Sequence, residues 1–194
     1  MDAAAITGRL ERFGPVLEAL VAGMGEEARW KPPSGAWSIL EIVCHLGDEE
    51  VEDFRPRVFS TLRDPAAAWV PIDPEGAARA RRYNEQDLAG ATARFVTERR
   101  RSVEMLRGLA EPDWSRAYMH PKLGPQTAGM VMASWAAHDA LHLRQIAKRM
   151  WELAGRDGAP YGTGYAGEWG RDWGRAGSLV VGVGWFREGL EEDE

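Results

Sequence analysis

Apolar side chains recur every three or four residues in four separate stretches of the chain, which is the spacing of an amphipathic helix. The first stretch covers residues 6–24, and the second starts near residue 39 and reaches the low sixties. The third covers residues 88–109, and the fourth, the most apolar, covers residues 127–154. No stretch before residue 178 shows the sustained alternation of a strand. Four long amphipathic helices with irregular links predict an all-α four-helix bundle.

The second predicted helix has a clear start signal. Ser38 is followed three residues later by Glu41, which is the capping-box pattern, and Trp37 and Ile42 stand where a hydrophobic staple packs. Because proline lacks a backbone N–H, Pro56 predicts a kink or a break in this helix. Between the third and fourth helices, residues 111–126 contain several prolines and predict a long irregular connection.

The composition of the chain changes after residue 155. From Gly155 on there are 11 of the 22 glycines, with Trp169, Trp173 and Trp185 among them. The glycines disfavour a regular helix. The tryptophans and the apolar run at 179–183 argue against full disorder. We therefore expect two parts: a bundle domain at residues 1–155, and a C-terminal extension at residues 156–194 that packs on the bundle or on a dimer partner.

Charge and composition narrow the range of functions. The formal net charge is −6, which opposes nucleic acid as the main partner because phosphate binding requires a basic surface. No run of 18 apolar residues is present, so we expect no membrane span. The N-terminus has no secretory pattern, and the single cysteine, Cys44, suits a reducing compartment. These features predict a cytoplasmic protein whose main partner is not nucleic acid.

Two of the four histidines, His138 and His142, lie four residues apart in the fourth predicted helix. At 100° per residue they are about 40° apart, and both fall inside the apolar stripe of that helix. Cβ atoms at this spacing are about 5–6 Å apart, so the two imidazoles can share one metal ion. The alternative is a pair of core histidines whose nitrogens bond to backbone groups or water.

His45, in the second predicted helix, stands at the border between the apolar face and an acidic flank. Together with the pair on the fourth helix it would give three neutral nitrogen ligands and leave coordination positions open. Glu49, one turn after His45, is the better candidate for a general base or for a group that orients a ligand, and Asp48 is the next. Cys44 points about 100° away from His45, which favours a small buried residue over a fourth ligand.

Three segments carry a family resemblance: WSILEIVCHLGDEE at the start of the second helix, HPKLGPQT before the fourth, and WAAHDALHLRQI within it. In this order they resemble the DinB/YfiT-like metal-binding four-helix bundles, and the resemblance covers residues 5–152. In that family one histidine on the second helix and two on the fourth hold a divalent metal, often zinc or nickel. The resemblance therefore implies His45, His138 and His142 as ligands, and it implies a homodimer. Ligation by histidine alone also suits iron.

The resemblance also implies an activity. Members with an assigned reaction include thiol-dependent S-transferases and isomerases that use a small cellular thiol, and others are described as metal-dependent hydrolases. The first hypothesis is a metal-dependent S-transferase, in which Arg99 is one candidate to bind the carboxylates of a small thiol. The second is a hydrolase, in which Glu49 or Asp48 accepts a proton from water. The third is a stress-related module that binds metal without turnover.

Overall fold

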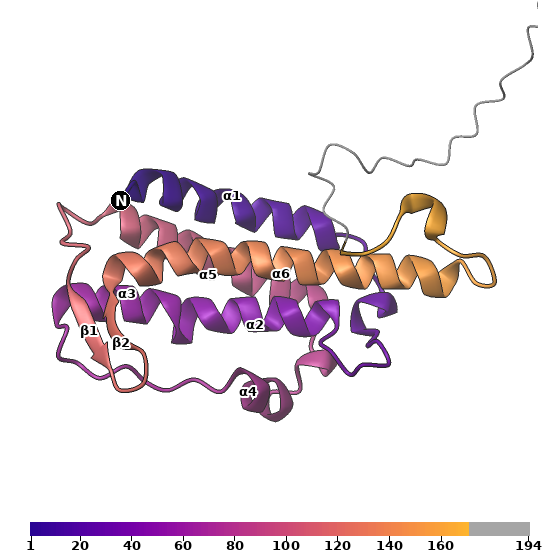
Figure 1. The fold of residues 1–194 in the computed structure, drawn as a ribbon, viewed down its shortest axis with the longest axis horizontal. Coiled ribbons are helices and arrows are strands. Elements are labelled where there is room, and N and C mark those ends of the chain that lie inside the picture. Colours follow the sequence, from indigo (N-terminus) through magenta and orange to yellow (C-terminus); the bar gives the residue numbers. More distant parts are fainter. Residues whose placement is uncertain (171–194) are drawn as a thin grey trace, which may run out of the picture. The chain divides into compact units, whose positions relative to one another are not determined.

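The computed structural model describes residues 1–170, and the chain divides into two compact units at residue 149. The first unit contains four long helical segments in the order expected for a bundle (Figure 1). The prediction of an all-α four-helix bundle is confirmed. Its helices, with η for short 3-10 helices, are α1 (Ala3–Val21), η1 (Glu26–Arg29), α2 (Ile39–Glu52), α3 (Phe54–Arg63), α4 (Pro74–Ala80), η2 (Tyr83–Glu85), α5 (Leu88–Arg107) and α6 (Ala128–Asp157), the last of which continues into the second unit.

Side-chain caps fix where several of these helices begin. Asp2 Oδ1 accepts from the backbone N–H of Ala5 at 2.8 Å, and Asp87 Oδ2 accepts from that of Gly90 at 2.7 Å. A carboxylate in this position satisfies a donor that has no partner within the helix, and it interacts favourably with the helix dipole. The first turns of α1 and α5 are therefore set by local sequence.

The second predicted helix is interrupted before its proline. α2 ends at Glu52 and α3 begins at Phe54, while Asp53 between them has φ −119° and ψ −85°, outside the helical region. Pro56 is the third residue of α3. The N–H groups in the first turn of a helix have no hydrogen-bond partner within the helix, so a proline there removes no helical hydrogen bond. The kink or break expected near Pro56 is thus a break, and it gives α3 its own start.

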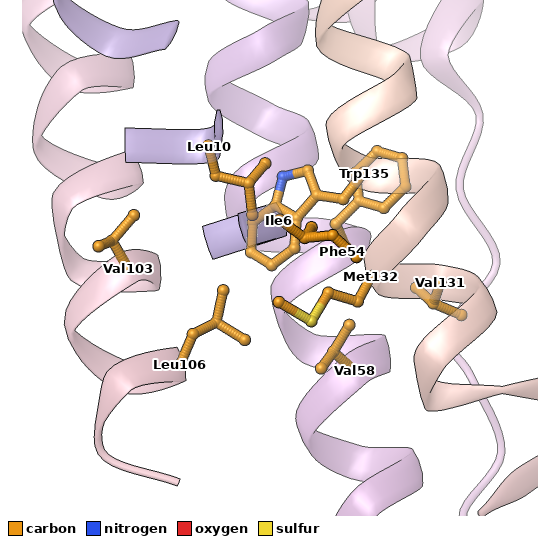
Figure 2. Packing of buried hydrophobic residues seen from close by; sticks show 9 residues of the cluster. All are labelled: Ile6, Leu10, Phe54, Val58, Val103, Leu106, Val131, Met132 and Trp135. Atoms are coloured by element: carbon orange, nitrogen blue, oxygen red, sulfur yellow. The ribbon is translucent and has the colours of Figure 1, made fainter. Parts of the chain in front are cut away.

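A cluster of buried apolar residues draws the helices of the bundle together (Figure 2). Phe54 at the start of α3 stacks on Trp135 of α6, with ring centroids 5.7 Å apart and an interplanar angle of 8°. The same phenylalanine ring lies 5.0 Å from the ring of His138. The core and the histidine pair therefore share one face of α6. The cluster consists of Ile6, Leu10, Phe54, Val58, Val103, Leu106, Val131, Met132 and Trp135.

Two elements differ from the sequence-based expectation. The connection at residues 111–126 contains an antiparallel hairpin, in which β1 (Ala117–His120) pairs with β2 (Gly124–Thr127). The turn uses a positive φ of 71° at Gly124, and Pro125 stands in β2, where proline weakens a strand signal. The short helix α4 was also not predicted. Its seven residues make about two helical turns, which is too short for an apolar repeat to be recognised.

The second unit is described up to residue 170. It contains the end of α6 and the 3-10 helix η3 (Gly164–Ala166), and the rings of Trp151 and Trp169 lie 6.1 Å apart. The remainder of the predicted extension, with Trp173, Trp185 and the run at 178–186, lies outside the described residues. The domain boundaries and the packing of the extension stay predictions. Among the described helices, none combines the length and hydropathy that crossing a membrane requires.

Candidate metal centre

The cap of α2 sets the position of His45. The Ser38 side chain accepts from the backbone N–H of Glu41 at 3.1 Å, and Glu41 Oε2 accepts from the backbone N–H of Ser38 at 2.8 Å, so the predicted capping box is present. His45 lies seven residues after Ser38, which is about two helical turns. Trp37, just before the cap, packs its ring 4.9 Å from the His45 ring. The start of α2 and its histidine are therefore fixed together.

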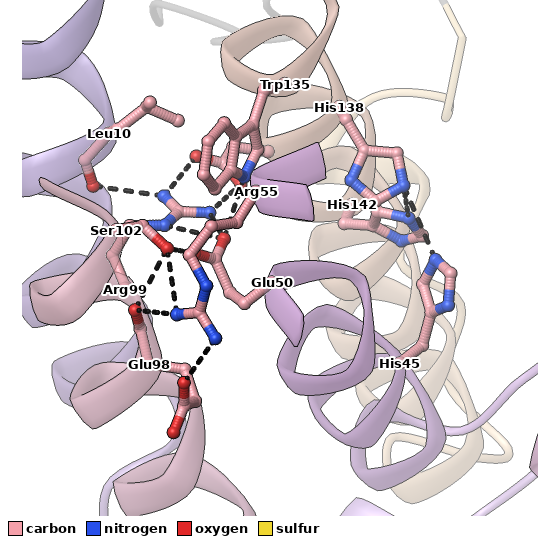
Figure 3. Close-up of polar contacts among 11 residues, drawn as sticks. Leu10, His45, Glu50, Arg55, Glu98, Arg99, Ser102, Trp135, His138 and His142 are labelled. Atoms are coloured by element: carbon pink, nitrogen blue, oxygen red, sulfur yellow. Dashed lines mark hydrogen bonds and ion pairs between the residues drawn. The ribbon is translucent and has the colours of Figure 1, made fainter. Parts of the chain in front are cut away.

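The structure brings His45, His138 and His142 together. Figure 3 shows the first pointing from α2 toward the other two on α6. The Nε2 atoms of His45 and His138 are 3.4 Å apart, and those of His138 and His142 are 2.9 Å apart. One nitrogen from each residue lies within 4.8 Å of the other two. Within residues 1–170 this is the one group of histidine, cysteine or carboxylate ligands close enough to share an ion.

Polar groups on the far side of two rings define what the converging atoms offer. His142 Nδ1 lies 2.9 Å from Gln145 Oε1, an amide oxygen that can only accept, so Nδ1 carries the proton. The carboxyl group of Glu49 faces His45 Nδ1, with Oε1 at 3.4 Å, and favours a proton on that nitrogen too. In a neutral imidazole the other nitrogen is then an acceptor. Nε2 lone pairs from α2 and α6 therefore point into one small volume.

Neutral rings with converging lone pairs fit a bound cation. Burial, together with the neighbouring histidines, lowers the pKa of His45 to about 3 and that of His138 to about 2. Burial also lowers the pKa of His142. The unprotonated Nε2 atoms of His45 and His142 cannot satisfy each other, whereas a metal ion with Zn–N bonds of about 2.0–2.1 Å can accept a lone pair from each ring. Nitrogen separations near 3 Å match that bond length, so the residues fit the metal that the sequence predicted.

Glu49 lies behind His45 rather than among the converging nitrogens. Its carboxyl is buried, and burial together with a hydrogen bond to Asp53 raises the pKa of Glu49 to about 9. Asp53 in turn pairs with Arg57 at 2.6 Å. A carboxyl group on the second nitrogen of a ligating histidine fixes its tautomer and orientation. Of the two roles expected for Glu49, the geometry favours orientation of the ligand.

Asp48 is placed differently from the other sequence-predicted site residues. Its carboxylate contacts the guanidinium of Arg81 and the hydroxyl of Tyr83, and it pairs with Arg94 at 2.5 Å. These partners come from the end of α4, from η2 and from α5. The contacts assign Asp48 to holding α4 and η2 against α2, and they do not support the role of proton acceptor.

Two further residues lie away from the histidine nitrogens. Cys44 is buried with its Sγ 3.8 Å from the backbone oxygen of Tyr83, and burial raises the pKa of the thiol to about 12. Arg99 is also buried, and it forms ion pairs with Glu50 at 2.7 Å and Asp139 at 2.6 Å. Figure 3 shows this network beside the histidines but separate from them. Arg99 as a substrate-binding residue is a wrong expectation, because two buried carboxylates already hold its guanidinium.

A pocket of about 380 Å³ adjoins the histidine centre. Trp37 and Gln145, which contact His45 and His142 respectively, both line it. His138 is partly exposed, whereas His45 and His142 are buried. Periodicity did not reveal this pocket, because it forms between residues from the loop before α2, from α4 and from α6.

The fold and the site together define a class of protein: a four-helix bundle in which one histidine of α2 meets two histidines of α6. Residues 9–146 match the DinB superfamily, and the chain belongs to that superfamily. Its fold is similar to that of YfiT from Bacillus subtilis, described as "a probable metal-dependent hydrolase with an unusual four-helix bundle topology". That match has a TM-score of 0.69 and 22% identity, over 80% of this chain and 87% of YfiT. A search of curated proteins found no match.

Proposed function

We propose that the three histidines hold a divalent metal ion and that the protein is a metal-dependent enzyme of the thiol S-transferase type. Zinc and nickel are the first candidates for the metal, and iron is the next. The observation that carries this proposal is the set of Nε2 atoms of His45, His138 and His142, which converge within 4.8 Å from two helices. Membership of the DinB superfamily supports it.

The protein's own residues prepare the site for this chemistry. A metal ion with three imidazole ligands keeps a position for substrate and lowers the pKa of a bound thiol or water. Gln145 and Glu49 hold two of the imidazoles in the tautomer that ligation requires. In the transfer, a sulfur–carbon bond forms, the bond to the leaving group breaks with its electron pair, and the thiol proton passes to water. The partial exposure of His138 supports that exit for the proton.

A metal-dependent hydrolase is the second candidate. The description of YfiT favours it, and Glu49 is the carboxyl group nearest to the ligands that could serve it. A hydrolytic base must reach the water that attacks the substrate. Glu49 instead contacts His45 on Nδ1, the nitrogen that faces away from the converging atoms. Asp48, the other candidate base, is held by Arg81, Tyr83 and Arg94 away from the centre. Because neither carboxyl group is placed to activate water, we rank thiol transfer first.

Cobalt substitution tests the proposal. Co(II)-loaded protein should show the intense visible bands of a low-coordinate site, and a small thiol should shift them as sulfur enters the coordination sphere. A shift with azide but not with thiol would favour the hydrolase. If neither ligand perturbs the bands, the coordination sphere is closed and the protein is a metal-binding module without turnover.

Two broader proposals accompany the enzyme. We propose a homodimer and a cytoplasmic location, on the basis of the family resemblance and the single buried cysteine. Sedimentation equilibrium of the full chain measures the first, and fractionation of the source cells measures the second. A molar mass equal to that of one chain at micromolar concentration would contradict the dimer.

A further inference from the structure

The side chain of Gln145 connects the histidine centre with the pocket beside it. Its amide oxygen lies 2.9 Å from His142 Nδ1 and accepts the proton of that nitrogen. Gln145 also lines the pocket, and its side chain is exposed. One residue of α6 therefore contacts a proposed metal ligand and, at the same time, the space that a substrate can occupy.

The amide nitrogen of Gln145 is open to a ligand. The nitrogen of a glutamine side chain carries two N–H donors, and it diverges from the oxygen at the same carbon atom. Because His142 holds the oxygen, the nitrogen is turned away from that ring. Within residues 1–170, Nε2 of Gln145 has no hydrogen-bond partner. The pocket therefore has a pair of N–H donors whose orientation is set by a residue of the histidine centre.

The other walls of the pocket favour an uncharged ligand. Trp37 and Ile42 give it an apolar side, and the ring of Trp37 lies 4.9 Å from that of His45. Arg149 also lines the pocket, but this buried arginine already has a partner in the protein. Glu75, exposed on α4, adds a negative charge that repels a carboxylate. An apolar wall with a few placed polar groups is typical of sites for small organic molecules.

We propose that Gln145 is a specificity-determining residue: its amide N–H groups bind a neutral carbonyl oxygen of the substrate, and Trp37 packs against the carbon chain beside that carbonyl. A carbonyl oxygen accepts from an amide N–H without a counter-ion, which suits the charges of the pocket. The inference rests on the proposed function, because it assigns the part of the substrate that lies next to its sulfur. The substrate class is a small thiol that carries an amide group.

The position of Gln145 sets how far the carbonyl lies from the sulfur. Gln145 contacts Nδ1 of His142, whereas the atom of His142 that faces the other histidines is Nε2. These two nitrogens lie on opposite sides of the imidazole ring. A molecule with its sulfur at the converging Nε2 atoms and its carbonyl on Gln145 must therefore extend past the ring, so several bonds separate the sulfur from the carbonyl.

Two thiols test the assignment: N-acetylcysteamine, and 1-pentanethiol, whose chain has the same length but no carbonyl. Titration of the Co(II)-loaded full chain gives a dissociation constant for each thiol from the visible bands. Gln145→Glu keeps an oxygen for His142 Nδ1 and replaces the N–H donors with an acceptor. We expect this variant to bind N-acetylcysteamine about 10-fold more weakly than the wild type does, as the loss of a hydrogen bond implies. Its affinity for 1-pentanethiol should be unchanged.

Two further variants separate specificity from positioning. Gln145→Leu removes the oxygen as well, so it should show the same loss for N-acetylcysteamine and also lower metal affinity by roughly 10-fold, whereas Gln145→Glu should keep its metal affinity. A residue that only positions His142 would lower metal affinity in Gln145→Leu and leave the ratio of the two thiol affinities unchanged. Gln126→Glu, which adds the same charge in β2, is the matched control and should bind both thiols as the wild type does.

The outcomes distinguish this inference from the proposed function. An unchanged affinity of Gln145→Glu for N-acetylcysteamine, or an equal loss for both thiols, overturns the assignment of Gln145. If no thiol shifts the bands of the wild type, the proposed function fails, and the pocket is tested without sulfur. Saturation-transfer NMR of the zinc-loaded full chain with N-butylacetamide then decides: the compound should receive saturation from the wild type and much less from Gln145→Glu. Equal saturation by the two proteins, or none by the wild type, rejects the inference.

Discussion

The surroundings of each histidine ring determine what the residue can do. His138 and His142 are surrounded by other rings on the apolar face of α6, whereas His120 Nδ1 accepts from the backbone N–H groups of Lys122 and Leu123 in an exposed turn. The lone pair of His120 already has hydrogen-bond donors in its own loop. Lone pairs that converge on one another have no such donor and require a metal ion as partner. Only the three converging histidines, His45, His138 and His142, should therefore determine metal content.

Substitution of His138 or His142 by alanine should remove stoichiometric metal. Two remaining imidazoles hold a divalent ion far less tightly, and metal bound to the native state stabilises it. We expect inductively coupled plasma mass spectrometry to find about one metal per chain in the wild type and in His120→Ala, and well below that in the other two variants. In His138→Ala and His142→Ala, adding metal should no longer raise the melting temperature. One metal per chain in His138→Ala would place the site elsewhere.

Glu49 is expected to act through His45. Glu49→Leu keeps a side chain of similar size but removes the oxygen that faces the ring Nδ1 of His45, and the loss of such partners typically costs about 10–100-fold in metal affinity. Competition with a chromogenic chelator measures this change. Asp48→Asn is the matched variant: it should lower the unfolding free energy through its lost ion pairs with Arg81 and Arg94 and leave metal affinity near the wild-type value. Equal losses of affinity in the two variants would contradict the distinction.

Cys44 should be inert in the folded protein. Its thiol is buried and its pKa is raised to about 12, so at pH 8 the neutral thiol predominates and the nucleophilic thiolate is scarce. Iodoacetamide at pH 8 should leave Cys44 unmodified in native buffer and should modify it fully in 6 M guanidinium chloride. Mass spectrometry of the intact chain reads both reactions, and rapid native modification would show that the start of α2 opens.

At the scale of helices, a buried charge network holds α2, α5 and α6 together. Arg99 of α5 bonds to Glu50 of α2, to Asp139 of α6 and to the backbone oxygen of Leu10. Glu50 also accepts from Ser102 and from the indole N–H of Trp135. The two carboxylates adjoin Glu49 and His138 in the chain. The network therefore ties together the segments of α2 and α6 that carry the histidines.

Removal of the central cation should be costly. Arg99→Met leaves Glu50 and Asp139 buried without their counter-ion, and breaking a buried pair typically costs about 3–5 kcal/mol. Arg107→Met, also on α5, removes an exposed pair with Glu11 and should cost roughly 0–1 kcal/mol. Urea unfolding followed by circular dichroism measures both. Similar costs for the two variants would mean that the network contributes no more than a surface ion pair.

The sequence predicted the elements whose signal is local. The start of α2 was readable because Ser38 and Glu41 form a cap within one turn, and the three histidines were readable because helical spacing relates them to an apolar stripe. The buried charge network could not be predicted in this way. Glu50 has no local feature that distinguishes it from Glu52, the exposed acid of the same helix, since its partners lie 49 and 85 residues away. Such pairings arise only when helices pack.

At the scale of the whole molecule, the metal centre lies entirely within the first compact unit. α6 continues to Asp157, two residues beyond the predicted end of the bundle domain, and the compact unit that holds all three histidines ends at residue 149. The caps, the core cluster and the buried network all consist of residues before that point. We therefore predict that the bundle folds and binds metal without the residues that follow Asp157.

A chain that ends at Asp157 should keep the helical circular dichroism per residue of the bundle and one metal per chain, because it retains every described contact of the first unit. Sedimentation equilibrium of the same truncated chain then reports the role of the removed residues. If the full chain is a dimer and the truncated chain a monomer with intact metal binding, residues 158–194 act in assembly. If truncation abolishes the helical signal or the metal, the extension is part of the bundle's core and the division near residue 155 is wrong. A short chain ending at Ala154 is the companion variant, since it removes only the last turn of α6 and should behave as the Asp157 chain does.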